Sequence, residues 1–487
     1  MRSARFALFV LLAGLVTAGV LTNSPPRSRT VVFAEHPVPS QPSVGAPGSL
    51  STTWFCAGAP LSPDGTSTAT LVLTNPTAVE AVGIVTIVPT DGSPIVRPTS
   101  VPASGRLTLS LGTLVNAGWA AATIEMHGSP VGAEIVTASV LGTDASPCSS
   151  SASREWYFAS GSTAVTETVK AREYITLYNP YPDDAAVDIS FVTNEGPLAP
   201  AALKGFVVPS GQLRIVDLTS SIARKDAIAS SIIARSGSVV AGRLQTYDGT
   251  SRTGTTFAGG ATAGREQWLF PYGEKANGVT NSLVVYNPTD SPAAVDLTFT
   301  LDGGQAEPLE LTVQAHSALT TSLDAIPQLP SGTPFSVWVK VTNGTPVVAE
   351  QVTDVTAVSG QVGSATTLGA TGPALRWLLG AGGVGAAQSE VLAIFNPGQK
   401  AITVSVTGIA PEPLAIPGLA NIQIAAGARL VIKLGDHIQL PNLPMVVEAS
   451  APVVVLRVLN QLGPPVAAGA GPVAGTGTSM QMGIVWP

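Results

Sequence analysis

One pattern recurs four times along this chain: an alternating apolar run, an Asn-Pro pair, a short polar turn and a second alternating run. The clearest copy spans Ser282–Gly304. Successive copies lie 104, 108 and 109 residues apart, and a period of this size indicates a repeated domain. The four pairs are Asn75-Pro76, Asn179-Pro180, Asn287-Pro288 and Asn396-Pro397.

The residues around each Asn-Pro pair predict an antiparallel hairpin. Before Asn287, aliphatic residues stay on one face, as at Leu283 and Val285, which is typical of a strand half-buried on a core. Proline lacks the N–H that a ladder needs, so the strand ends there and the asparagine bonds the backbone of the turn. The chain then returns through an alternating run such as Val295–Phe299.

About seven short strands fit into each unit, and no segment has a useful helical period. We therefore predict an all-β chain of four tandem antiparallel immunoglobulin-like β-sandwich repeats after an N-terminal hydrophobic helix. A rod and a closed array of repeats both remain open. The expected segments are 1–22 (signal anchor or signal peptide), 23–52 (Pro/Ser-rich tether), 53–150 (repeat 1), 151–262 (repeat 2), 263–372 (repeat 3) and 373–487 (repeat 4).

Each repeat begins with a short strand that contains a tryptophan, and the C-terminal Gly483–Pro487 resembles a fifth copy of this strand. We interpret the tryptophans as packing residues rather than as a platform for sugars. They are Trp54, Trp156, Trp268 and Trp377. Segments rich in small residues, such as Gly142–Ser153 and Gly249–Gly264, separate the repeats. These segments are flexible linkers or, if the aromatic strand closes the preceding sandwich, crossover loops.

The N-terminus predicts the compartment. Arg2 and Arg5 precede the apolar run Phe6–Leu21, whose length falls between a signal-peptide core and a membrane-spanning helix. Because Pro25 follows the nearest small-residue cleavage site, we expect an uncleaved anchor, with a cleaved signal peptide as the alternative. In either case we expect export, with the chain anchored on the outer face of the cytoplasmic membrane or secreted.

The charge balance bears on the partners of the chain. Only 11% of the residues are charged and the formal net charge is −7, with no basic stripe. Neutralising phosphates needs clustered lysine and arginine, so we predict no nucleic-acid partner.

Two cysteines, Cys56 and Cys148, lie at the two ends of repeat 1. They lack the C-x-x-C spacing of a metal or redox site and have no neighbouring histidine. We therefore expect a structural disulfide formed in an oxidising compartment.

No motif in the sequence predicts catalysis, a metal or a cofactor. The run Gly380–Gly385 matches G-x-G-x-x-G, but the equivalent place in the other repeats is a variable loop, and no βαβ unit follows. We therefore predict no nucleotide partner. The four histidines lie in four separate regions, whereas acid–base and metal chemistry need convergent groups. They are His36, His127, His316 and His437.

Three aromatic residues directly precede an Asn-Pro pair on the face of the strand that varies between repeats. We take Tyr178, Tyr286 and Phe395 as candidate exposed contacts for a ligand. Exposed aromatic rings of this kind bind sugars in carbohydrate modules.

The whole pattern resembles the repeats of exported bacterial sandwich proteins. The residues that carry the resemblance are the aromatic strand, the L-x-L-x-N-P run, Gly118-Trp119-Ala120, and the Pro-Val pairs at Pro130, Pro346 and Pro452. With its N-terminal anchor, the chain is similar to an uncharacterised actinobacterial envelope family known as a domain of unknown function. The resemblance covers about residues 53–487 and implies no catalytic residues.

These observations favour a non-enzymatic, membrane-tethered scaffold or interaction protein of the bacterial cell envelope. Its partners would be the membrane, through the N-terminal helix, and envelope proteins or polysaccharide. The alternative is a protein that binds glycans of the cell wall. A hydrolase with a site assembled between repeats would require non-repeated acidic residues in one cleft.

Overall fold

Alternating apolar and polar residues form strands throughout the part of the chain that the structure describes. The structure is a computed structural model and describes residues 41–45, 48–62, 67–128, 130–358, 361–386, 388–461 and 477–487. The expected N-terminal helix lies outside these ranges, as does most of the expected tether. Within them, no helix is long and apolar enough to cross a bilayer.

The strands follow the repeats. Repeat 1 contains β1 (Ser51–Pro60), β2 (Ser67–Asn75), β3 (Ala81–Pro89), β4 (Ile95–Val101), β5 (Gly105–Ser110), β6 (Trp119–His127), β7 (Gly132–Ser139) and β8 (Gly142–Pro147). Repeat 2 contains β9 (Glu155–Phe158), β10 (Val169–Tyr178), β11 (Ala185–Thr193), β12 (Gly196–Leu198), β13 (Phe206–Val208), β14 (Leu213–Asp217), β15 (Ile228–Ser236), β16 (Val240–Gly249) and β17 (Gly254–Gly259).

Repeats 3 and 4 repeat this order. Repeat 3 contains β18 (Gln267–Glu274), β19 (Val279–Asn287), β20 (Ala293–Leu301), β21 (Gly304–Gln305), β22 (Leu309–Val313), β23 (Ser317–Ser322), β24 (Pro334–Val341), β25 (Val348–Val358) and β26 (Gln361–Leu368). Repeat 4 contains β27 (Ala374–Leu379), β28 (Gln388–Phe395), β29 (Ile402–Gly408), β30 (Leu414–Ala415), β31 (Ile422–Ile424), β32 (Arg429–Lys433), β33 (Met445–Gln461), β34 (Gly477–Met482) and β35 (Ile484–Val485).

Helical structure in the described ranges is short and lies in the connections. The elements are η1 (Leu111–Thr113), η2 (Ala201–Leu203), α2 (Leu218–Ser221), η3 (Leu323–Ala325) and η4 (Leu434–Asp436).

Each repeat builds two antiparallel groups of strands that share one core. In repeat 1, one sheet has the order β1-β6-β3-β4 and the other β5-β2-β7-β8. Apolar side chains from both sheets, such as Trp54, Leu71 and Ile124, belong to the same buried cluster. In repeat 4 the long β33 takes part in both groups, so the two sheets are continuous there. The prediction of antiparallel all-β repeats is thus confirmed at the level of fold class.

The strand order differs from the immunoglobulin order that the sequence suggested. In an immunoglobulin domain the first strand lies beside the second, in the sheet opposite the sixth and seventh. Here β1 pairs with β6, and β7 pairs with β2. Sequence periodicity identifies strands but carries little information on which strands pair across a sandwich, and the immunoglobulin-like part of the prediction is not confirmed.

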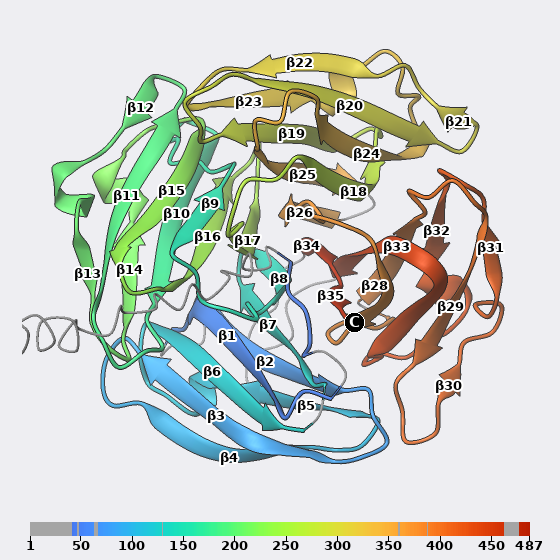
Figure 1. Cartoon of the computed structure of the whole chain (residues 1–487), viewed down its shortest axis with the longest axis horizontal. Coiled ribbons are helices and arrows are strands. Elements are labelled where there is room, and N and C mark those ends of the chain that lie inside the picture. The colour runs from blue at the N-terminus through green and yellow to red at the C-terminus, as the bar shows by residue number, and fades with distance from the viewer. Residues whose placement is uncertain are drawn as a thin grey trace, which may run out of the picture. The chain divides into compact units, whose positions relative to one another are not determined.

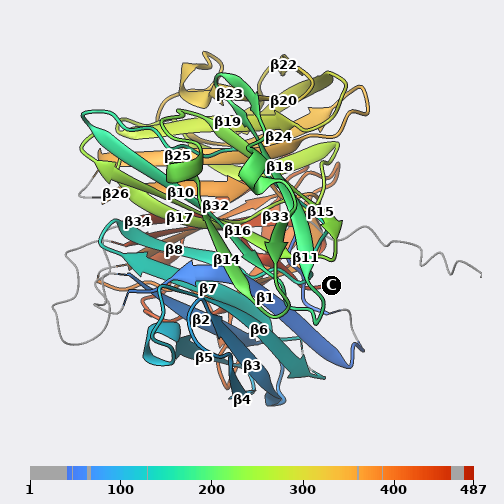
Figure 2. The same ribbon diagram turned by 90° about the vertical axis from the view of Figure 1, so that its left-hand side faces the viewer.

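Four strands, one from each repeat, meet in the middle of residues 39–487, which form one compact unit. We call β8, β17, β26 and β34 the inner strands. Each contacts the next around a closed circuit, β8 to β17, β17 to β26, β26 to β34 and β34 back to β8. Figure 1 shows the four repeats, coloured from blue to red, arranged around these strands, and Figure 2 shows β8, β17 and β34 stacked near one another.

The segments expected to be linkers or loops contribute these inner strands. β8 lies within Gly142–Ser153 and β17 within Gly249–Gly264. Their small residues permit close approach, since a Cβ on Gly254 would lie 2.4 Å from the backbone nitrogen of Ser364 in β26. A composition rich in glycine therefore reflects dense packing here rather than flexibility.

Hydrogen bonds join the inner strands at each contact. The Phe257 N–H donates to Asp144 Oδ2 at 2.6 Å, and the Thr366 N–H donates to Thr256 Oγ1 at 3.3 Å. On the other side, Thr367 Oγ1 donates to the Met480 carbonyl at 2.6 Å. The Ala145 N–H donates to Ser479 Oγ at 3.1 Å, which closes the circuit between repeats 4 and 1. The array is therefore closed rather than rod-like.

The asparagine of each Asn-Pro pair fastens the two sheets of its repeat together. Asn287 is fully buried; its Nδ2 donates to the Ser291 carbonyl in the turn and to the Val313 carbonyl at the end of β22, at 2.7 and 3.1 Å. Its Oδ1 accepts the Thr289 N–H at 3.0 Å. The predicted turn bond is confirmed, and the same side chain also reaches the opposite sheet. Asn75, Asn179 and Asn396 make equivalent bonds.

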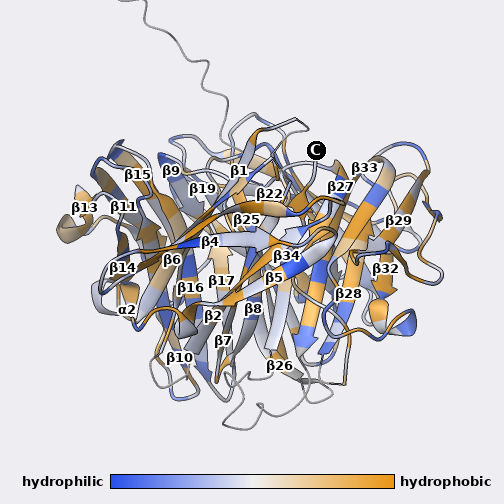
Figure 3. Cartoon of the chain, turned by 90° about the horizontal axis from the view of Figure 1, so that it is seen from below, coloured by the Kyte–Doolittle hydropathy of each residue, from blue (hydrophilic) through white to orange (hydrophobic). Residues whose placement is uncertain are grey.

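The four repeated tryptophans are core residues, as expected. Each side chain is at most 2% exposed, and each indole N–H donates to a backbone carbonyl of its own repeat at 2.7–2.9 Å. Figure 3 shows that hydrophilic bands interrupt otherwise hydrophobic strands such as β33.

The two ends of the described chain meet beside the inner strands. β35 pairs with β27 of its own repeat, so the C-terminus closes repeat 4 rather than beginning a fifth. In the other repeats, the segment after the inner strand likewise pairs with the strand that contains the tryptophan. Ser149, for example, forms a β-bridge with Phe55. The Val485 N–H donates to the Pro42 carbonyl at 3.0 Å, and the Val44 N–H donates to the Val485 carbonyl at 2.9 Å.

Candidate functional site

Each repeat buries one charged residue at one of two adjacent positions: glutamate stands three residues after Val131 and Val347, and arginine stands four residues after Val239 and Val453. The four residues lie on β7, β16, β25 and the second half of β33. The residues are Glu134, Arg243, Glu350 and Arg457. All four are at most 1% exposed.

These residues pair across two of the four contacts between repeats. We call the contact between neighbouring repeats a seam and number it by the repeats that it joins. At seam 2–3, Arg243 Nη1 lies 2.9 Å from Glu350 Oε2; at seam 4–1, Arg457 Nη2 lies 2.7 Å from Glu134 Oε2. Removing either partner of such a pair would leave a buried charge uncompensated.

A second glutamate joins each pair. Glu173 on β10 and Glu390 on β28 occupy equivalent places, six residues before an Asn-Pro pair. Burial raises the pKa of each carboxyl to about 8, although Arg243 and Arg457 oppose the shift. Because the carboxylate form is costly to bury, the protonated acid is favoured in the folded state at neutral pH.

Backbone groups complete both clusters. The Ser160 N–H and Oγ donate to Glu350 Oε2 at 2.9 and 2.7 Å. At seam 4–1, the Ala381 N–H donates to Glu134 Oε2 at 2.7 Å. Each arginine also donates to a carbonyl in the same loop, that of Ser160 or Ala381. We call these two groups the seam clusters: Glu173, Arg243 and Glu350 at seam 2–3, and Glu390, Arg457 and Glu134 at seam 4–1.

The glycine run that matches G-x-G-x-x-G belongs to the second seam cluster. The Gly380 N–H donates to Glu134 Oε1 at 3.1 Å, and the Gly383 N–H donates to Glu390 Oε2 at 2.8 Å. A Cβ on Gly382 would lie 2.6 Å from Glu390 Oε2. The loop thus donates backbone N–H groups to acidic side chains, as a phosphate loop donates them to a phosphate, but the acceptors are two glutamates of the chain itself.

The seam clusters are suited to proton uptake and to holding repeats together rather than to catalysis. Their side chains are sealed from solvent, so a substrate has no access. Elsewhere in the described ranges, no group of three or more His, Cys, Asp or Glu is placed to hold a metal ion. His316 pairs with exposed Asp290, and His437 bonds a carbonyl, far from one another in sequence.

The three candidate ligand contacts are buried, so the expectation that they are exposed was wrong. Tyr178 and Tyr286 are each 3% exposed and Phe395 is 1% exposed. The hydroxyl of Tyr178 hydrogen-bonds Thr123 of repeat 1, and that of Tyr286 hydrogen-bonds Ser231 of repeat 2, both at 2.7 Å. The face that varies between repeats is the face that packs on the preceding repeat.

The predicted disulfide between Cys56 and Cys148 is confirmed. It joins β1 to the residue directly after β8, and it therefore ties the inner strand of repeat 1 to the opposite sheet. Such a bond is typical of proteins in an oxidising compartment outside the cytoplasm.

Seam 3–4 departs from the pattern of the other seams. Phe395 replaces the tyrosine of seams 1–2 and 2–3, and Trp338 replaces the hydroxyl residue that pairs with it. The two rings lie edge to face, with centroids 6.4 Å apart. Beside them lies a pocket of about 560 Å³ with a predominantly apolar wall.

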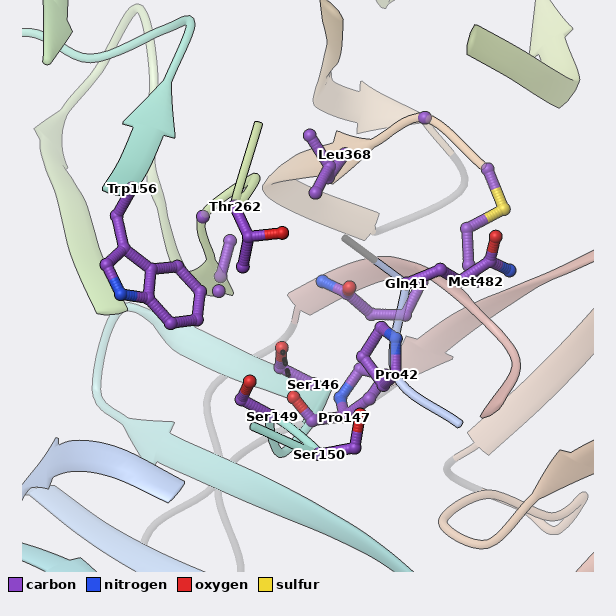
Figure 4. Close-up of a pocket in the computed structure, with 15 residues that line it drawn as sticks. Gln41, Pro42, Ser146, Pro147, Ser149, Ser150, Trp156, Thr262, Leu368 and Met482 are labelled. Atoms are coloured by element: carbon purple, nitrogen blue, oxygen red, sulfur yellow. Dashed lines mark hydrogen bonds between the residues drawn. The ribbon is translucent and has the colours of Figure 1, made fainter. Parts of the chain in front are cut away.

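Two further cavities lie between repeats. One of about 330 Å³ at seam 2–3 is lined by Asp226 and by the ion pair of Arg252 with Asp354. The other, of about 60 Å³, lies where Gln41 and Pro42 approach the inner strands; Figure 4 shows these residues beside Ser146, Trp156 and Met482. The second is too small for more than water-sized occupants.

The seam clusters are not foreseen from the sequence. A glutamate or an arginine follows Val131, Val239, Val347 and Val453 by three or four residues. Charged residues are usually exposed, so this pattern alone does not indicate buried pairs. The closed array brings Glu134 and Arg457 together, although 323 residues separate them.

Comparisons with known proteins identify a family but no activity. No protein with a curated description matches this sequence. Among solved structures, Thermotoga maritima 1070 is 25% identical over 22% of this chain and 93% of its own, with a TM-score of 0.20. The Anabaena sensory rhodopsin transducer is 22% identical over 18% of this chain and 80% of its own, with a TM-score of 0.17.

A third solved structure, Streptomyces avermitilis alpha-L-rhamnosidase, is 12% identical over 70% of this chain and 46% of its own, with a TM-score of 0.16. Likenesses at TM-scores this low carry no conclusion about this chain. Residues 139–263 and 244–467 match the model described as a family of unknown function, DUF5719, and together they span more than half of the 487 residues. The chain therefore belongs to the DUF5719 family.

Proposed function

We propose that this chain is a non-enzymatic scaffold of the bacterial cell envelope, exported and tethered to the membrane by its N-terminal segment. The observation that carries the proposal is the closed array of four repeats, sealed at two seams by buried charge clusters. Such an array presents several fixed outer surfaces from one rigid core, which suits a protein that holds partners in place.

Two further features support the proposal. The disulfide between Cys56 and Cys148 fits an oxidising compartment. The described end of the expected tether, Gln41–Val44, is joined to repeats 3 and 4 by hydrogen bonds to Thr371 and Val485. A pull on the tether would therefore act on the centre of the array rather than on one outlying repeat.

Complementation of a strain that lacks this protein distinguishes a scaffold function from an enzymatic one. One variant carries Asp226→Asn and Asp354→Asn, which removes the carboxylates of the polar cavity at seam 2–3. The other carries Glu134→Lys, which opposes Arg457 with a like charge inside seam 4–1. A scaffold predicts full rescue by the first variant and none by the second.

Loss of rescue by the first variant, with its fold intact by circular dichroism, would instead indicate chemistry in that cavity and would contradict the scaffold. Protease accessibility in intact spheroplasts tests the compartment separately. A scaffold on the outer face is digested without lysis, whereas a cytoplasmic protein is protected.

Binding of cell-wall glycans is the second candidate function. The observation that favours it is the presence of a pocket with a tryptophan in its wall at seam 3–4. The tyrosines suggested by the sequence do not support it, because they are buried. Retention on purified cell-wall polysaccharide, compared between the unmodified chain and Trp338→Ser, tests this candidate.

A further inference from the structure

The pocket at seam 3–4 lies where repeats 3 and 4 depart from the repeat pattern. Its wall includes Leu269 of β18, at a place where repeats 1 and 2 have Phe55 and Tyr157. Its rim includes Gly398, where the other Asn-Pro turns have Thr77, Tyr181 and Thr289. Two lining positions thus carry smaller side chains than in the other repeats, while Trp338 is larger than the Thr123 and Ser231 at the equivalent place.

The wall of the pocket is chemically uneven. Most of it is apolar and is formed by Leu269, Trp338, Pro397, Ile402 and Pro452. The polar side chains that line it, Gln267, Asn396, Gln399 and Lys400, contribute a small part of its surface. A sugar with hydroxyls all round would therefore leave several hydroxyls without hydrogen-bond partners. Each hydroxyl buried without a partner costs binding free energy, so an apolar body fits this wall better than a sugar.

Positive charge lies at one side of the pocket, and no acidic residue lines it. Lys400 lines the rim, and Lys340 Nζ lies 3.7 Å from the centroid of the Trp338 ring. In β20, Asp296 is the strand neighbour of Lys340, yet among the described residues neither lysine forms an ion pair. An anionic group in the pocket would therefore meet Lys400, a cation without an acidic partner among the described residues.

We propose that this pocket binds an anionic amphiphile, with the hydrocarbon part of a fatty acid against Trp338 and its carboxylate beside Lys400. The wall supplies the apolar surface and Lys400 supplies the complementary charge. This inference is independent of the scaffold function, because a scaffold needs no small ligand. It also competes with glycan binding at the same pocket.

Isothermal titration calorimetry on the whole exported chain tests the proposal, with octanoate, decanoate and dodecanoate below their micellar concentrations. Affinity should rise about fourfold for each added CH₂ that is buried. Decanol should bind severalfold more weakly than decanoate, and Lys400→Gln should remove that difference. Burial of the chain should also give a negative heat-capacity change on binding.

Gly398→Tyr provides the blocking variant, since it places at the rim the side chain that repeat 2 carries as Tyr181. It should weaken dodecanoate binding at least tenfold. Gly118→Tyr is the matched control, because Gly118 lies in repeat 1 and a Cβ there has no neighbour within 4 Å. That variant should bind as the unmodified chain does.

Three results would overturn the proposal. The first is the absence of binding by all three fatty acids, and the second is binding that Gly398→Tyr leaves unchanged. The third is competition between dodecanoate and a neutral cell-wall oligosaccharide in which the sugar binds more tightly, which would assign the pocket to glycans. None of these results would contradict the scaffold, whose test depends on Glu134.

Discussion

Arg457 in the last repeat forms a buried ion pair with Glu134 in the first, at 2.7 Å, and this pair seals the closed array. The same arrangement joins Arg243 to Glu350 across seam 2–3. The four repeats therefore carry two complementary pairs, and each pair lies between repeats rather than within one. The alternation of charge favours the observed neighbours over other pairings of similar repeats.

Breaking one ion pair should strongly destabilise the array. We expect Arg457→Met to lower the free energy of unfolding by about 3–5 kcal/mol, because Glu134 would remain buried without its partner. Combining it with Glu134→Gln should recover much of the loss. Asp188→Asn, which breaks the exposed pair with Arg235, is the control and should cost far less than Arg457→Met. Urea denaturation measures all four proteins, and equal losses for the buried and exposed pairs would refute this account of seam 4–1.

Stability should fall as the pH rises from about 5 to 8. The pKa of Glu173 and of Glu390 is about 8 in the folded chain against an ordinary value of 4.5. In that window the folded state holds protons that the unfolded state has released, so the free energy of unfolding decreases with pH. Glu173→Gln with Glu390→Gln should flatten the profile. If the variant and the unmodified chain gave parallel profiles, these carboxyls would not hold their protons as described.

Asn287, which bonds both the turn and the opposite sheet, should contribute more to stability than an exposed residue of the same turn. Asn287→Ala leaves the Ser291 and Val313 carbonyls without this donor, and each buried group left unpaired costs about 1–3 kcal/mol. Asp290→Asn in the same turn is exposed and should change stability by less than about 0.5 kcal/mol. Denaturant midpoints compare the two; similar midpoints would mean that Asn287 acts only within the turn.

Truncating Ile484 should strongly lower stability, although it is the fourth residue from the C-terminus. Ile484 is fully buried and belongs to the core cluster of repeat 1 as well as pairing with β27. Ile484→Ala should therefore cost about 2–5 kcal/mol. Leu50→Ala is the control, since Leu50 is 90% exposed. A thermal midpoint for Ile484→Ala equal to that of the control would show that the C-terminus does not close repeat 4.

Local features of the fold could be predicted from the sequence because they depend on neighbouring residues. The Asn-Pro turn, the alternating strands and the buried tryptophans need only short-range pattern and elementary backbone chemistry. The disulfide between Cys56 and Cys148 was also predictable, since the chain has only these two cysteines. Strand order was not, because period-two alternation gives the same pattern whichever strand lies alongside.

The candidate site is formed by contacts between repeats, and the alternation of apolar and polar residues does not specify those contacts. The alternating pattern predicts that Tyr286 points away from the core of its own repeat. It does so, but its hydroxyl bonds Ser231 of the preceding repeat, so this face is covered. Likewise, the sequence left open whether the glycine-rich segments are flexible linkers or crossover loops, and Gly254 lies in an inner strand against Ser364. In both cases the sequence specifies the chemistry of a surface and leaves open what covers it.

Cross-linking between repeats 1 and 4 tests the closed array most directly. Arg106 Nη2 donates to Asn442 Oδ1 at 2.7 Å across the surface of seam 4–1, and both native cysteines are held in the disulfide. In a chain with Arg106→Cys and Asn442→Cys, a short bis-maleimide at low protein concentration should give a monomeric, internally linked product in high yield, and none after unfolding in urea. A folded chain that stays unlinked, or that forms only links between molecules, would contradict the closed array.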